Sequence, residues 1–111
     1  MKITEAKTSA EIAYCLSELG RKWSNNDARA SFLEENKKTV LSQLALKHPD
    51  LGVSKAENMA LADPVYQAHI NAMVEARKEA NIAKVDYDTA RAYIDLMRTE
   101  AATRRAEINL R

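Results

Sequence analysis

The sequence has 111 residues, which is long enough for one domain and too short for two. Seventeen Lys and Arg residues stand against sixteen Asp and Glu residues, so the formal charge of +1 removes the simplest argument for a nucleic-acid binder, a globally basic chain. Hydrophobic residues make up 46% and charged residues 30% of the chain, and only two Gly and two Pro occur. This composition favours helices over sheets and predicts an all-α protein.

The chain has a single cysteine, Cys15, which cannot form an internal disulfide. One Cys and two distant His residues cannot build a structural zinc site, so we expect no metal and no other cofactor. No apolar run is long enough to cross a bilayer, and residues 1–7 lack the apolar stretch of a signal peptide. These features predict a cytoplasmic protein that does not bind a membrane.

The first predicted helix covers residues 9–47. Thr8 offers a hydroxyl and Glu11 a carboxylate three residues later, which is the pattern of a capping box. Residues 24–27, Ser-Asn-Asn-Asp, are the weakest helical stretch, where a kink or short break could occur, and Pro49 ends the helix. The apolar side chains recur every three or four residues and form one stripe: Ile12, Leu16, Leu19, Trp23, Ala30, Leu33, Val40 and Leu44.

Two further helices are predicted after a turn. Ser54 and Glu57 repeat the capping pattern and predict a short helix over residues 55–62. Asp63 and Pro64 then supply an N-cap and a first-turn proline for another helix. Because residues 64–111 contain no further Gly or Pro, we expect one helix of roughly 72 Å. The predicted architecture is an elongated helical hairpin with one short intervening helix and a long C-terminal helix that resembles a coiled coil.

A heptad repeat runs along this long helix when Met73 is placed at position a. The a positions are then Tyr66, Met73, Ala80, Tyr87, Ile94, Ala101 and Ile108, and the apolar d positions are Ala76, Ala83, Ala90 and Met97. Position e forms a basic stripe of Arg77, Lys84, Arg91, Arg98 and Arg105, whereas position g holds Glu79, Asp86, Tyr93, Glu100 and Glu107. One flank of the seam is therefore basic and the other mainly acidic.

These flanks predict parallel self-association. In a parallel pair Glu79 would meet Lys84, Asp86 would meet Arg91, and Glu100 would meet Arg105 of the neighbouring copy. The first helix has no comparable run of charges, so parallel neighbours are favoured over antiparallel ones. The residues predicted to form this oligomer interface are Met73, Ala80, Tyr87, Ile94, Met97, Ala101 and Ile108. A second apolar line of Ile82, Val85, Tyr93, Leu96 and Leu110 lies on another face, so one face is expected to pack on the first helix and one on a neighbouring subunit.

Catalytic chemistry is not indicated by the sequence. His48, His69 and Cys15 are isolated from partners that would make a nucleophile–base pair, and an imidazole in such a place is most often a surface or satisfied core group. No Gly-rich phosphate loop, Cys pair or metal-binding His-Glu motif occurs. We therefore expect a protein that is not an enzyme.

A nucleic-acid interface is a possible use of the basic side chains. The candidates are Arg77, Lys84, Arg91, Arg98, Arg104 and Arg105, which could follow a phosphodiester backbone. The alternative is that the basic stripe only pairs with the acidic flank, and Arg104 and Arg105 also complement the helix dipole. Trp23 and Tyr93 are the better candidates for stacking on bases, since the heptad places Tyr66 and Tyr87 in the core.

Several stretches carry a family resemblance: a first helix with a tryptophan, Ser-Lys-Ala-Glu at 54–57, Asp-Pro-Val-Tyr at 63–66, and Arg-Thr-Glu-Ala-Ala-Thr-Arg-Arg-Ala-Glu-Ile at 98–108. In these the chain resembles small helical proteins of bacteriophage recombination and replication modules. With Lys-Val-Asp-Tyr at 84–87 it is also distantly similar to recombination mediators of the UvsY type. The resemblance implies an oligomer that holds single-stranded DNA and helps to load a recombinase over a single-strand-binding protein in the host cytoplasm.

Three functions are therefore expected from the sequence. The first is a homo-oligomeric phage-type accessory protein of DNA recombination that binds single-stranded DNA, a recombinase, or both. The second is a helical adaptor or inhibitor that binds a host or phage protein without DNA. The third is a homo-oligomeric scaffold with no other ligand.

Overall fold

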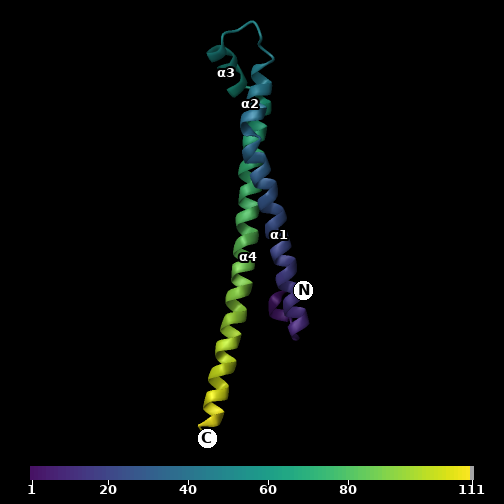
Figure 1. The fold of residues 1–111 in the computed structure, drawn as a ribbon, viewed down its shortest axis with the longest axis vertical. Coiled ribbons are helices and arrows are strands. Elements are labelled where there is room, and N and C mark those ends of the chain that lie inside the picture. Colours follow the sequence, from purple (N-terminus) through teal and green to yellow (C-terminus); the bar gives the residue numbers. More distant parts are fainter. Residues whose placement is uncertain (111) are drawn as a thin grey trace. The chain divides into compact units, whose positions relative to one another are not determined.

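The computed structural model describes residues 1–110, and every regular element in them is helical (Figure 1). The elements are a short 3-10 helix η1 (Ile3–Glu5), α1 (Ser9–Glu35), α2 (Lys37–Ala45), α3 (Val53–Leu61) and α4 (Pro64–Asn109). The prediction of an all-α fold with a long C-terminal helix is confirmed. Arg111, the last residue of the predicted helix over 64–111, lies outside the described residues.

The predicted cap at the start of α1 is present. Thr8 Oγ1 accepts a hydrogen bond from the backbone N–H of Glu11 at 3.1 Å. The Glu11 carboxylate accepts from the backbone N–H of Lys7 at 3.1 Å, one residue before the position expected for a capping box. These bonds satisfy backbone donors that have no partner inside the helix, which explains why α1 begins at Ser9.

The start of α4 is also as predicted, but the start of α3 is not. Asp63 Oδ1 accepts from the backbone N–H of Val65 at 2.8 Å, and Pro64 is the first helical residue. By contrast, α3 begins at Val53 with Gly52 as its N-cap and without a side-chain cap bond. The prediction that Ser54 caps this helix is wrong, because Ser54 already lies within the helix.

The first predicted helix is interrupted at a different place from the weak stretch in its sequence. Residues 24–27 are helical, and α1 continues through them to Glu35. The interruption falls at Asn36, where backbone bonds from Asn36 to Phe32 and from Val40 to Asn36, both 3.0 Å, keep the helical direction. Asp27 is held by a tertiary ion pair, which favours the helical conformation of the weak stretch.

The chain forms two compact units, each of which contains part of α1 and part of α4. Unit 1 joins Met1–Trp23 to the chain from Ile82 onward, and unit 2 is Ser24–Asn81. Both long helices pass through both units, so each unit holds one antiparallel pair of helical segments. α2 and α3 belong to unit 2 alone and pack against each other.

The core of unit 2 is built from small side chains. Ala30 of α1 is 0% exposed, and Ala76 and Ala80 of α4 are 1% exposed, with Leu33 packed against them. Alanine at each contact lets the two helix backbones approach closely. The α2–α3 pair buries Leu44, Ala56 and Ala60 in the same unit.

The core of unit 1 combines alanines with one aromatic pair. The rings of Trp23 and Tyr87 lie 5.6 Å apart at 37°. Ala83 and Ala90 are buried on the same side of α4. Near the N-terminus, the buried Cys15 thiol donates to the backbone carbonyl of Met1 at 3.6 Å, so the segment that contains η1 is held against α1.

Gly20 offers a direct test of the packing in unit 1. It lies inside α1, where glycine costs about 0.5–1 kcal/mol relative to alanine. A Cβ added at Gly20 would meet Tyr87 Cε2 at 3.6 Å, an ordinary van der Waals contact. Gly20→Ala should therefore raise the free energy of unfolding by about 0.5–1 kcal/mol in urea denaturation followed by circular dichroism. A decrease would show that the α1 and α4 segments of unit 1 lie too close together to accept a Cβ at Gly20.

Candidate interaction surfaces

The polar cluster with the most side-chain hydrogen bonds among the described residues lies in unit 2 around Arg77. Its Nε donates to Glu34 Oε1 at 2.7 Å, one terminal nitrogen donates to Glu34 Oε2 at 3.1 Å, and the other donates to Asp27 Oδ1 at 2.8 Å. Ser31 Oγ lies 3.4 Å from the guanidinium as a further acceptor. The Arg77 side chain is only 34% exposed. This arrangement uses most of the planar donor set of arginine for contacts within the chain.

These contacts engage two residues for which the sequence predicted other partners. Arg77 was a candidate for nucleic-acid binding, but its donors are occupied by Asp27 and Glu34 of α1. Glu79 was expected to meet Lys84 of another copy, but it accepts from Arg29 of α1 at 3.2 Å. α1 thus provides partners for charges on both flanks of the seam, although the sequence predicted no comparable run of charges in the first helix. One sequence signal could have revealed these ion pairs. Asp27 and Glu34 are seven residues apart and so lie on the same side of α1, where both can reach a single cation, Arg77, on an antiparallel helix.

The Arg77 cluster should make stability depend on pH. The hydrogen bonds from Arg77 lower the pKa of Glu34 below its ordinary value of 4.5, and the two carboxylates raise the pKa of Arg77. Because the pKa of Glu34 is lower in the folded state, its contribution to stability is present above about pH 4.5 and is lost as the pH falls through the lowered value.

Glu34→Gln should therefore be less stable than the wild type at pH 7, and the difference should shrink as the pH is lowered below 4.5. Urea denaturation of both proteins across this range measures the difference. Glu35→Gln, a neighbouring exposed position outside the cluster, is the matched control and should remain close to the wild type. If the difference in the free energy of unfolding between Glu34→Gln and the wild type did not change with pH, the lowered pKa of Glu34 would be wrong.

The predicted oligomer interface is largely covered by α1 of the same chain. Ala80 belongs to the core cluster of unit 2, and Met73 is half-buried in that unit. In unit 1, Tyr87 packs against Trp23 and lies within 4 Å of a Cβ placed on Gly20. The seam prediction correctly identified Ala80 as buried and Tyr87 as a packed, half-buried position, but the helix that covers them is α1, packed antiparallel.

The seam becomes accessible towards the end of α4. A groove of about 450 Å³ in unit 1 is lined from α4 by Ile94, Met97, Arg98 and Ala101, and from α1 by Ser9, Ile12, Ala13 and Leu16. Met97 is 40% exposed and Ile108, beyond the groove, is 66% exposed. Of the predicted interface residues, Met97, Ala101 and Ile108 therefore remain available to another molecule.

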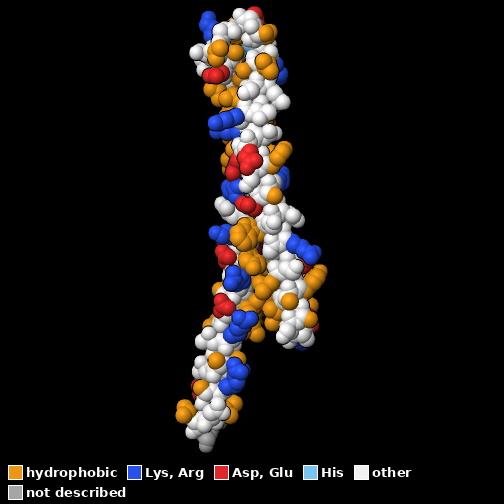
Figure 2. Space-filling view, in the orientation of Figure 1, with side chains coloured by type: hydrophobic (Ala, Val, Ile, Leu, Met, Phe, Trp, Pro, Cys, Tyr) orange, Lys and Arg blue, Asp and Glu red, His pale blue; other side chains and the backbone are white. Residues whose placement is uncertain are grey.

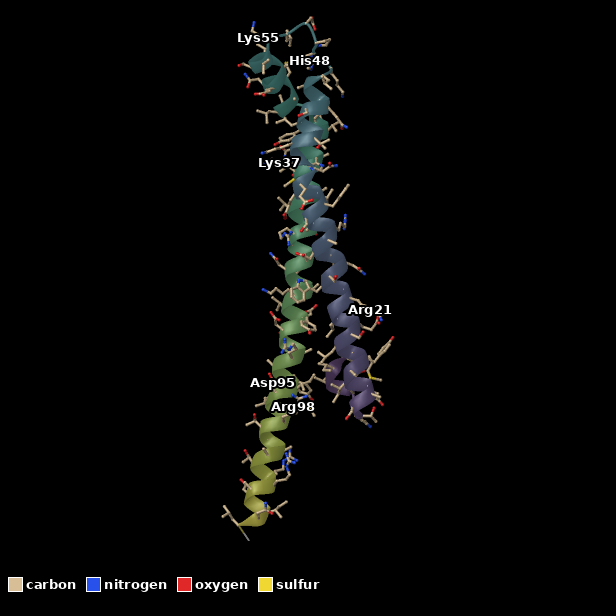
Figure 3. The ribbon with its side chains drawn as sticks, viewed as in Figure 1. Arg21, Lys37, His48, Lys55, Asp95 and Arg98 are labelled. Carbon is tan, nitrogen blue, oxygen red and sulfur yellow. The ribbon has the colours of Figure 1, made fainter. Side chains whose placement is uncertain are left out.

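The other predicted nucleic-acid-binding cations lie in unit 1 and differ in their surroundings. Lys84 Nζ lies 5.9 Å from the centre of the Trp23 ring, within reach of a cation–π contact. Arg104 is 4.0 Å from Glu100 one turn away. Within residues 1–110, Arg91, Arg98 and Arg105 are exposed and form no ion pair with an acidic side chain. Figure 3 labels Arg98 together with Asp95 on this part of α4.

A separate surface of α4 in unit 1 carries exposed apolar side chains. Ile82 is 51%, Val85 61% and Leu96 57% exposed, on the side of the helix opposite the alanines that face α1. Leu110 follows the end of α4 and is also exposed. Four residues of the second apolar line predicted from the sequence are thus exposed to solvent, and the fifth, Tyr93, is half-buried.

Unit 2 has its own group of exposed apolar side chains on and around α2 and α3. Leu46 and Val53 are 76% and 77% exposed, and Met59, Leu61 and Val65 are about half exposed. Figure 2 shows apolar side chains in orange in this region. Both units therefore offer apolar surface that a protein partner could cover.

The groups that would be candidates for chemistry have structural partners. His69 Nε2 lies 2.8 Å from the backbone carbonyl oxygen of Leu33, and the Cys15 thiol is 3% exposed. Among residues 1–110 no group of three or more His, Cys, Asp or Glu side chains is placed to hold a metal ion. In the same part of the chain, none of the helices has both the length and the apolar character required to cross a membrane.

Comparison with protein-family models, with curated proteins and with solved structures finds no match to this chain. The resemblance to phage recombination proteins accordingly stays a prediction from the residues that carry it.

Proposed function

We propose that this is a non-enzymatic helical accessory protein that acts by binding another protein through α4. The observation that carries the proposal is the exposure of Ile82, Val85 and Leu96 on a helix whose opposite side is already buried against α1. A surface helix that packs along one side normally has a polar outer side. The outer side of α4 is instead apolar at these three exposed positions, which favours a helix that is covered by a partner.

The resemblance to phage recombination modules defines the first partners to test, a recombinase and a single-strand-binding protein. We further propose a cytoplasmic location, in keeping with the single cysteine of the chain. The satisfied imidazole of His69 and the buried thiol of Cys15 support a role without catalysis.

The experiment compares protein capture by three tagged forms of the full chain. Val85→Asp combined with Leu96→Asp should abolish stoichiometric capture of a purified recombinase or single-strand-binding protein that the wild type retains, because both charges lie on the proposed surface. Tyr14→Asp combined with Phe32→Asp alters equally exposed aromatic positions on α1 and should retain capture. Equal capture by all three forms, or capture by none of them, would contradict the proposal.

Binding of single-stranded DNA is a second candidate function. It is favoured by Lys84, Arg91, Arg98 and Arg105, which recur every seven residues and form no ion pair with an acidic side chain within residues 1–110. Figure 2 shows that basic side chains (blue) alternate with acidic ones (red) along this part of α4, so the local field is mixed. Fluorescence anisotropy of a labelled oligonucleotide tests this function, and absence of binding at tens of micromolar protein in low salt would exclude it.

Homo-oligomerisation stays a prediction, now limited to the end of the seam. Met97, Ala101 and Ile108 could contact the same residues of a parallel copy, with Glu100 facing Arg105 across the pair. Light scattering of the wild type and of Ile108→Asp tests this arrangement, and a monomer at all concentrations would rule out both the oligomer and the scaffold function.

A further inference from the structure

The exposed side of α4 in unit 1 has a composition that is unusual for a helix surface. Heptad positions c and f, which lie opposite the seam, hold nine residues from Ile82 to Leu110, and none of them is charged. At the average charged fraction of the chain, 30%, about three of the nine would be charged. We call these nine residues the outer face: Ile82, Val85, Thr89, Ala92, Leu96, Thr99, Thr103, Ala106 and Leu110, all of which are exposed.

The threonines of the outer face contribute apolar rather than polar surface at two positions. Thr99 Oγ1 donates to the backbone carbonyl of Asp95 at 3.0 Å, and Thr103 Oγ1 donates to that of Thr99 at 3.0 Å. Because the hydroxyl donors are used within the helix, the methyl groups are left for contact with a partner. The apolar surface thus extends from Leu96 towards Leu110.

The charged residues that border the outer face are all acidic. Positions b and g on its two sides contain Asp86, Asp88, Asp95, Glu100 and Glu107, which we call the acidic rim, and no Lys or Arg from Ile82 onward within the described residues. Within residues 1–110 only Glu100 of the rim has an ion pair, with Arg104 at 4.0 Å. The cations of this part of α4 lie on the other flank of the seam, at position e, apart from Arg104 at the last d position within the described residues.

This charge arrangement determines what can cover the outer face. A second copy that used its own outer face would place acidic rim against acidic rim in either orientation, which is repulsive. A helix with an apolar stripe bordered by Lys or Arg would bury the outer face and pair with carboxylates on both sides. From the exposed apolar stripe and its acidic rim, we infer that the outer face binds a basic amphipathic helix of another protein. This inference specifies the partner chemistry and rests on the function proposed above.

The experiment uses two labelled synthetic helices and the full-length protein. Both peptides carry Leu at heptad positions a and d, and they differ only in having Lys or Glu at the flanking positions. The wild type should bind the Lys peptide at least tenfold more tightly than the Glu peptide in fluorescence anisotropy. Leu96→Asp and, independently, Val85→Asp should each weaken binding of the Lys peptide at least tenfold, with circular dichroism showing that the fold is kept.

Charge reversal distinguishes specific recognition from general attraction between opposite charges. Asp88→Lys combined with Asp95→Lys should remove or reverse the preference for the Lys peptide. Asp50→Lys combined with Glu57→Lys changes the net charge equally at exposed sites of unit 2 and should leave the preference unchanged. Equal binding of both peptides, equal effects of the two double variants, or a dimer in light scattering that Leu96→Asp dissolves would overturn the inference.

The outcome also separates this inference from the proposed function. If Val85→Asp with Leu96→Asp abolishes capture of a protein partner but the wild type does not prefer the Lys peptide, the binding surface is correct and the partner chemistry is wrong. If the variants leave capture unchanged, the proposed function itself fails.

Discussion

Replacement of Ala80 by leucine should lower the free energy of unfolding by about 1–3 kcal/mol. Ala80 is 1% exposed and lies in the cluster formed with Ala30 and Ala76. A leucine there has no space between the two helices, so the α1 and α4 segments of unit 2 must separate or the side chain must adopt a strained rotamer. Either response loses packing across the whole cluster.

The same separation should also weaken the Arg77 cluster, which joins the same two helical segments. Arg77 lies three residues before Ala80 and reaches Asp27 and Glu34 on α1. Ala80→Leu is therefore expected to reduce the pH dependence that Glu34 confers, in addition to lowering stability. Urea denaturation at pH 7 and in acid measures both effects.

A matched control separates overpacking from the effect of leucine on a helix. Ala68→Leu makes the same substitution on α4 in the same unit, at an exposed position. It should change the free energy of unfolding by less than about 0.5 kcal/mol. If Ala80→Leu were as stable as Ala68→Leu, the α1 and α4 segments of unit 2 would not be in close contact at Ala80.

Arg91→Glu combined with Arg98→Glu should reduce affinity for single-stranded DNA by roughly fifty-fold or more at low salt, if the basic stripe binds DNA. Four cations remain available in the stripe once Arg77 is engaged with α1, namely Lys84, Arg91, Arg98 and Arg105. Contacts from all four to phosphates would give a slope of about −2.8 for log affinity against log salt. The double variant removes two of the four contacts, so the salt dependence should become less steep, with a slope of about −1.4.

The same variant separates two roles of the stripe. If the cations contact DNA, a folded protein with an unchanged assembly state should survive while DNA affinity is lost. If they join subunits, assembly and binding should fail together. Lys37→Glu combined with Lys55→Glu changes the net charge equally at exposed positions of unit 2 and should keep DNA affinity within a few-fold (Figure 3). Loss of affinity in this control would show that net charge, not the stripe, governs binding.

The sequence by itself determined where α1 and α4 begin and that α2 ends before Pro49, because these boundaries depend on local chemistry. Thr8 and Asp63 cap α1 and α4 through hydrogen bonds to residues two or three positions away. Pro49 cannot continue a helix, and α2 ends at Ala45 before it. The heptad pattern also identified Ala76, Ala80, Ala83 and Ala90 as positions that must be buried.

Only the tertiary structure decided which partner buries those positions and which charges are used. An apolar seam of alanines and a flank of charges fit a parallel copy or an antiparallel helix of the same chain, since periodicity describes one helix and not its neighbour. The contacts of Asp27 and Glu34 with Arg77 join residues at least 43 positions apart, a distance that no local pattern specifies. Because α1 covers the seam, the outer face and its acidic rim are exposed in unit 1 and open to a partner.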